Sequence, residues 1–199
     1  AGIANAMGLR RIRQWEATDW KARYDAERHP GMLNWESVHH VVIIPNYKEH
    51  ESGLARTLDS LAAQANAKQL VVVMAMEARE AGARGKAARL LMRYRNRFGH
   101  LFATYHPYGI PGETPGKGSN EAWAAREARI RLIEHGGEEI TRFSITSCDA
   151  DAVFHPAHFD ALNYLFLTAP DRYRTFWQPT IFNTNNIWDI PAPLRIPDG

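Results

Sequence analysis

The chain has 199 residues, of which 45% are hydrophobic and 23% charged, and this length and composition indicate one folded domain rather than a disordered chain. A formal net charge of +2 is too small to indicate a nucleic-acid-binding protein, and no apolar run reaches the ~18 residues of a membrane-spanning helix. The single cysteine, Cys148, excludes an internal disulfide bond and a cysteine-based zinc site, so we expect a reducing compartment.

The first predicted element is a basic amphipathic helix that begins near Gly8. Leu9, Ile12 and Trp15 share one face of this helix, and the other face carries three arginines: Arg10, Arg11 and Arg13. Two interpretations stay open. The helix packs on its own domain, or it rests on the anionic cytoplasmic leaflet of a membrane.

The rest of the chain alternates short β-branched runs with stretches of helical periodicity. Strands are predicted over Val38–Ile44, Gln69–Met74, Leu101–Tyr105 and Phe143–Ser147. Helices are predicted between them over Glu51–Ala65, Glu80–Arg97 and Ser119–His135. This alternation predicts an α/β fold with a Rossmann-like, mostly parallel sheet and helices on both faces. Ligands of such sheets bind beyond the carboxyl ends of the strands, which are the loops after Ile44, Met76 and Ser147.

Two of these loops carry side chains that suit a nucleotide and a metal ion. Tyr47 can stack on a base and Glu49 can accept hydrogen bonds from hydroxyl groups, although the same residues would also form an ordinary strand-to-helix turn. Asp149 and Asp151 follow the fourth strand at a spacing that lets both project oxygen ligands toward Mg²⁺ or Mn²⁺. An Asp-x-Asp pair is also common in turns and helix caps.

A glycine-rich segment, residues 108–118, opens the third predicted helix. Its backbone N–H groups can approach an anion, and Lys117 would add a positive charge. The segment lacks the P-loop spacing because Gly118 follows the lysine. A plain surface loop is the alternative.

Together these segments, from about Val41 to Ile196, resemble the nucleotide-sugar-binding part of family 2 glycosyltransferases, which have the GT-A fold. Residues 41–49 resemble the opening strand and Pro-x-Tyr-Asn-Glu element of the family, with Lys48 where asparagine is usual. The resemblance implies that four side chains line the nucleoside: Pro45, Asn46, Tyr47 and Glu49.

Two further segments resemble family motifs that bind the diphosphate. Residues 116–122 resemble the Lys-x-x-x-x-Asn/Ala helix entry, which implies that Lys117 faces the diphosphate with Asn120 close by. Residues 148–151 resemble the Asp-x-Asp motif. This implies that Asp149 contacts the ribose or the metal and that Asp151 coordinates Mn²⁺ or Mg²⁺.

The chain also departs from the family pattern. After the second strand the family usually shows paired aspartates that read the base, and here Glu77 is the carboxylate that would substitute. Residues 177–183 are similar to the Gln-x-Pro segment of cellulose-synthase-like members, which places Gln178 on the acceptor side. Asp189 lacks a partner acid, so we expect the base that activates the acceptor to lie beyond Gly199.

The resemblance therefore implies two parts and one activity. Residues 1–37 form an N-terminal amphipathic, juxtamembrane helical segment, and residues 38–199 form a GT-A nucleotide-sugar-binding core that is truncated at its C-terminus. The core belongs to a metal-dependent, inverting glycosyltransferase at the cytoplasmic face of the membrane, anchored through segments outside this chain. It moves a hexosyl group from a UDP-sugar to a lipid or polysaccharide acceptor, and nucleic acid is not a partner. The alternative is a non-catalytic nucleotide-sugar-binding or scaffold domain.

Overall fold

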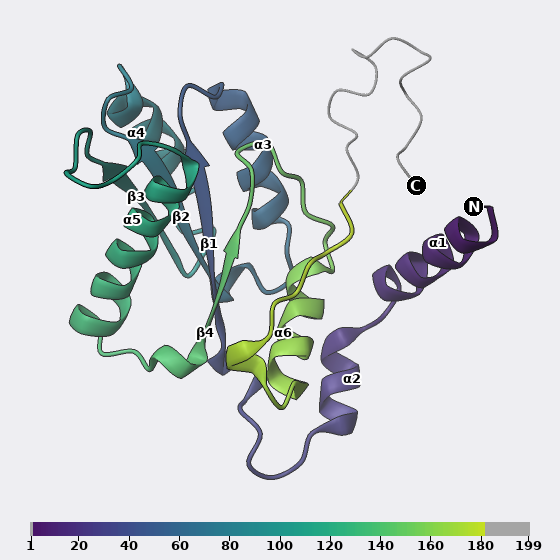
Figure 1. Ribbon diagram of the computed structural model, residues 1–199. Helices are drawn as coiled ribbons and strands as arrows, with labels where there is room; N and C mark the ends of the chain where they lie inside the picture. Colours follow the sequence, from purple (N-terminus) through teal and green to yellow (C-terminus); the bar gives the residue numbers. More distant parts are fainter. Residues whose placement is uncertain (1, 182–199) are drawn as a thin grey trace.

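Four parallel strands form the centre of the computed structural model, which describes residues 2–181 (Figure 1). They are β1 (His39–Asn46), β2 (Leu70–Glu77), β3 (His100–His106) and β4 (Phe143–Ser147). The strands lie in the order β3-β2-β1-β4, and each neighbouring pair is parallel. Strands β2 and β3 are added in turn on one side of β1, and β4 is added on the other side. The strand order therefore reverses between β1 and β4.

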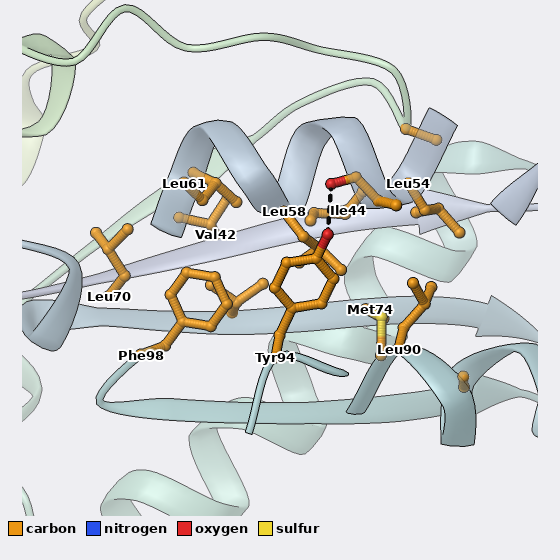
Figure 2. Close-up of a cluster of buried hydrophobic side chains, with 14 of the residues drawn as sticks. Val42, Ile44, Leu54, Leu58, Leu61, Leu70, Met74, Leu90, Tyr94 and Phe98 are labelled. Atoms are coloured by element: carbon orange, nitrogen blue, oxygen red, sulfur yellow. Dashed lines mark hydrogen bonds between the residues drawn. The ribbon is translucent and has the colours of Figure 1, made fainter. Parts of the chain in front are cut away.

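Helices cover both faces of this sheet, which confirms the predicted fold class. Helices α3 (Glu51–Ala62) and α4 (Ala83–Arg93) pack on one face, where Val42 and Ile44 of β1 point (Figure 2). Helix α5 (Lys117–Arg129) packs on the other face, against Val41 and Ile43. Successive residues of a strand point to opposite faces, so an unbroken apolar strand fits a sheet that is buried on both sides.

The N-terminal region joins the rest of the molecule at α6 (His158–Thr168) rather than at the sheet. Helix α1 (Gly2–Glu16) extends away from the body of the molecule, whereas α2 (Trp20–Glu27) lies along α6 (Figure 1). A separate aromatic cluster joins this region to α6, with core residues Trp20, Tyr24, Trp35, Tyr164 and Phe166. None of the helices within residues 2–181 is long and apolar enough to span a membrane.

The strand predicted to stop before Pro45 continues through it to Asn46. Pro45 pairs with Ala75 of β2, while the pairing of β1 with β4 ends earlier, at Ile43 and Ser147. The Ile43 carbonyl accepts a hydrogen bond from the Cys148 N–H (3.2 Å), so the backbone groups of Ile43 point toward β4. The backbone of Pro45, two residues later, points to the same side. Because the backbone of Pro45 faces β4, its missing N–H removes no hydrogen bond between β1 and β2.

Helices α3 and α4 are shorter than the predicted helical ranges of residues 51–65 and 80–97. Helix α4 begins at Ala83 because Gly82 has a left-handed backbone (φ 84°), and it ends before Asn96, which also has a positive φ (64°). The predicted third helix divides into α5 and a π-helical turn over Ile130–His135.

Candidate functional site

The candidate site lies at the carboxyl edge of the sheet, where the strand order reverses between β1 and β4. Ligands of open α/β sheets bind in the crevice at such a position. A pocket of about 410 Å³ opens there, between the first turn of α3 and the loop after β4. Its lining includes the carboxylates of Glu49 and Asp151, the guanidinium of Arg56, and the polar side chains of His50 and Ser52.

The turn after β1 is closed by its own carboxylate. The Glu49 Oε2 atom accepts hydrogen bonds from the Asn46 side-chain amide (2.7 Å) and from the Tyr47 backbone N–H. Asn46 is buried, whereas the Tyr47 ring is partly exposed at the edge of the sheet. The Pro45–Glu49 element therefore presents an aromatic ring and a carboxylate beside the crevice, as its sequence predicts.

The loop after β4 is held against α3 by a polar stripe on that helix. The Thr57 hydroxyl donates to the Ala150 carbonyl (2.8 Å), and the Ser60 hydroxyl accepts from the Phe154 N–H (3.2 Å). Just beyond the C-terminal end of α3, the Gln64 side chain donates to the His155 carbonyl (3.0 Å). Residues at this helical spacing share one face, so a single side of α3 fixes the segment that carries Asp149 and Asp151.

We call Lys117 and Asp149 the outer charge pair. The Lys117 Nζ atom lies 2.5 Å from Asp149 Oδ1, and the two side chains are 54% and 73% exposed. The hydrogen bond to Asp149 raises the pKa of Lys117. Asn120 lies beneath the pair, buried, with its amide donating to the Ala75 carbonyl of β2 (2.7 Å). The structure thus brings together the start of α5 and the Asp-x-Asp loop, which are 32 residues apart.

Four ionisable side chains form an inner charge cluster at the ends of β2 and β3: Glu77, Arg79, His106 and Glu113. Glu77 Oε2 lies 3.2 Å from Arg79 Nε, and Glu77 Oε1 lies 3.5 Å from His106 Nδ1. His106 Nε2 lies 3.3 Å from Glu113 of the glycine-rich loop. The side chains of Glu77 and His106 are both 3% exposed. The Glu77 carboxylate is therefore surrounded by protein partners.

Arg79 also connects the inner charge cluster to the aromatic residues of the edge. Its guanidinium lies 4.3 Å from the centre of the Tyr47 ring and 5.7 Å from that of Tyr108. These distances are typical of cation–π contacts. One face of Tyr47, the ring predicted to stack on a base, is thus covered by a cation.

Cys148 packs beneath the Asp-x-Asp motif. Burial raises the pKa of its thiol to about 12, and its Sγ lies 3.8 Å from the Ile43 carbonyl. The thiol therefore stays protonated at neutral pH, and Cys148 is a packing residue rather than a nucleophile.

The predicted acceptor-side residue lies on the segment after α6. Gln178 is exposed, and its amide donates to the adjacent Pro179 carbonyl (3.5 Å). Its neighbour Trp177 packs on Phe166 of α6 rather than on the residues that line the crevice. Asp189 lies outside the described residues.

The chemistry of Asp149 and Asp151 fits a divalent cation that is shared with a diphosphate. Mg²⁺ is commonly bound through one or two carboxylates, with phosphate oxygens and water completing the shell. Within the described part of the chain, no three histidine, cysteine or carboxylate side chains gather as a complete protein-made metal site. Two carboxylates on one loop therefore suit a cation that arrives with its ligand.

Sequence reasoning missed the residues that support the edge from below, above all Lys86 of α4 and Glu80 before it. A signal for Lys86 was present in the helical spacing. It falls between Ala83 and Leu90, on the apolar face of α4, whereas the other basic residues of that helix are exposed.

Comparisons of this chain with family models, with curated proteins and with solved structures return no match.

Proposed function

We propose that this chain binds a nucleotide-diphosphate sugar, with UDP as the nucleotide, at the carboxyl edge between β1 and β4. In this proposal it is the donor-binding core of a metal-dependent glycosyltransferase. The observation that carries the proposal is the 2.5 Å contact between Lys117 and Asp149 at the point where the strand order reverses. Motifs from distant parts of the sequence, each resembling a diphosphate-binding motif, meet at the position where this class of sheet binds ligands.

Each side chain has a chemical role in the proposal. Tyr47 and Glu49 bind the nucleoside, one by stacking and the other by accepting hydrogen bonds from hydroxyl groups. Lys117 compensates negative charge on the diphosphate, and Asp149 and Asp151 would hold Mn²⁺ or Mg²⁺. The cation would stabilise the charge that develops on the leaving diphosphate. When donor binds, Lys117 exchanges part of its contact with Asp149 for the phosphate oxygens.

Isothermal titration calorimetry with UDP tests the proposal. We expect wild-type protein to bind UDP in the presence of Mn²⁺ and to bind it about tenfold or more weakly without the metal. Asp151→Asn should bind UDP weakly with or without Mn²⁺, because a metal ligand is lost. Asp171→Asn changes an exposed aspartate after α6 and should behave as wild type. Four indistinguishable titrations of wild type and Asp151→Asn, with and without Mn²⁺, would overturn the metal assignment.

Turnover separates the transferase from the alternative, a non-catalytic nucleotide-sugar-binding domain. A transferase also needs a group that accepts the proton of the acceptor hydroxyl. Release of UDP from a UDP-sugar in the presence of a lipid or polysaccharide acceptor supports the transferase. Tight binding of the UDP-sugar, with no release of UDP in the presence of any acceptor tested, supports the binding domain.

Association with the cytoplasmic face of a membrane stays a prediction. What supports it is the exposed basic surface of α1: Arg10, Arg11 and Arg13. Positive side chains of this kind are attracted to anionic lipids.

A further inference from the structure

The turn between β1 and α3 contains a backbone conformation that its own sequence does not favour. Lys48 has a φ of 70°, in the left-handed region that residues with a side chain seldom occupy. Such a conformation persists where the surrounding structure fixes it. The turn also sets the positions of Tyr47 and Glu49, which flank Lys48 on either side.

Two side chains from outside the turn hold it in this conformation. The Lys48 N–H donates to Glu80 Oε2 (2.8 Å), and Glu80 precedes α4 in the sequence. The Lys86 ammonium donates to Glu80 Oε1 (2.6 Å) and to the Glu49 backbone carbonyl (2.9 Å). The backbone on both sides of the left-handed residue is thus bound by one ion pair.

This ion pair is buried. The side chains of Lys86 and Glu80 are 9% and 10% exposed. Removing two charges from water costs about as much as their attraction returns, so a buried ion pair contributes little net stability compared with an apolar pair of the same size. What it supplies in this position is a fixed set of hydrogen bonds to the turn.

We propose that Glu80 and Lys86 are positioning residues of the donor site, which hold the Tyr47–Glu49 turn in the conformation that binds the nucleoside. Lys86 acts through the Glu49 carbonyl, and Glu80 acts through the Lys48 N–H. The effect on ligand binding rests on the proposed function, whereas the effect on the turn does not. The two effects can therefore be measured separately.

The test replaces the ion pair with apolar residues of similar size, Glu80→Leu with Lys86→Met. Lys86→Met alone would leave the Glu80 carboxylate buried without its partner, which destabilises the fold. The double variant removes both charges, so we expect it to fold. The matched control is Arg89→Met. Arg89 lies on the same helix and pairs with Glu51 of α3 (2.7 Å), but that pair is more exposed and has no described contact with the turn.

Two measurements are made on each protein. Amide hydrogen exchange, followed by NMR, reports the Lys48 N–H, with the Val72 amide in the middle of β2 as an internal reference. Calorimetry with UDP and Mn²⁺ reports affinity. In the double variant we expect Lys48 to exchange about tenfold faster or more, because its acceptor is gone, while Val72 is unchanged. The affinity for UDP should fall about tenfold, and Arg89→Met should match wild type in both measurements.

The outcomes separate the two proposals. If wild type does not bind UDP but Lys48 exchange accelerates in the double variant, the proposed function fails and the control of the turn stands. If wild type binds UDP and the double variant binds it equally well, Glu80 and Lys86 are not positioning residues of the donor site. Unchanged Lys48 exchange in the double variant would overturn the role in the turn itself.

Discussion

The inner charge cluster and the outer charge pair lie at the same edge of the sheet and differ in their contact with water. In the inner cluster, Glu77 and His106 are buried. In the outer pair, the side chains of Lys117 and Asp149 are more than half exposed to solvent. A buried ionised group depends on its protein partners, whereas an exposed one exchanges its partner for a ligand at little cost. We therefore expect the inner cluster to support the loops, whereas the outer pair is where the proposed ligand contact lies.

The largest expected effect is on the inner charge cluster. Glu77→Gln removes the buried charge that faces Arg79, so the partly buried Arg79 guanidinium loses the carboxylate 3.2 Å from its Nε atom. We expect the free energy of unfolding to fall by about 3 kcal/mol, measured by urea denaturation at pH 7. Asp160→Asn, at a half-buried carboxylate of α6, is a suitable control. A loss below about 1 kcal/mol would mean that the inner cluster does not support the fold and does not differ in this respect from the outer pair.

A second expected effect concerns a buried titratable group away from the edge. Burial lowers the pKa of His40 to about 3, with smaller contributions from the neighbouring His158 and His39. In the unfolded chain this group titrates near its ordinary pKa of 6.5. The unfolded state therefore binds more protons below pH 6.5, and stability is lost as the pH falls from 6.5 toward 3.

Between pH 7 and pH 5, we expect this histidine to lower the free energy of unfolding by about 2 kcal/mol. His40→Gln should flatten the dependence on pH, as measured by urea denaturation at both values. His135→Gln removes an exposed histidine and should leave the dependence as it is in wild type. If the two variants show the same slope, burial does not control the protonation of His40.

The smallest expected effect on stability is at the outer charge pair. Lys117→Met should change the free energy of unfolding by about 0.5 kcal/mol or less, because exposed ion pairs contribute little. The same variant should lower the affinity for UDP with Mn²⁺ about tenfold, measured by calorimetry. The outer pair is thus expected to matter little for stability and much for UDP binding. A stable variant with unchanged affinity would remove Lys117 from the donor site.

Much of the fold could be predicted because it depends on patterns within one segment. The β-branched run before Pro45 and the apolar spacing of Leu54, Leu58 and Leu61 identify a buried strand and the helix that packs on it (Figure 2). The same reasoning located the three loops at the carboxyl edge. Element ends were predicted less well because they depend on single backbone conformations, such as the left-handed Gly82.

The contacts within the site were harder to predict because they join residues that are distant in sequence. The pairing of Glu80 with the Lys48 N–H depends on the path of two turns, and nothing in either segment alone indicates it. The family resemblance predicts that Glu77 reads the base in place of the usual paired aspartates. Its pairing with Arg79 was equally open to the sequence, since the two are neighbours at i and i+2. Motifs therefore located the site, and the topology determined which side chains meet there.

Pro45 has a consequence for the shape of the crevice. In a parallel ladder, the next hydrogen bond between β1 and β4 would run from the N–H of residue 45 to the Cys148 carbonyl. Proline has no N–H, so the ladder stops and the two strands are free to diverge at this point. The opening between β1 and β4 thus begins at a position where the backbone has no donor for the next rung of the ladder.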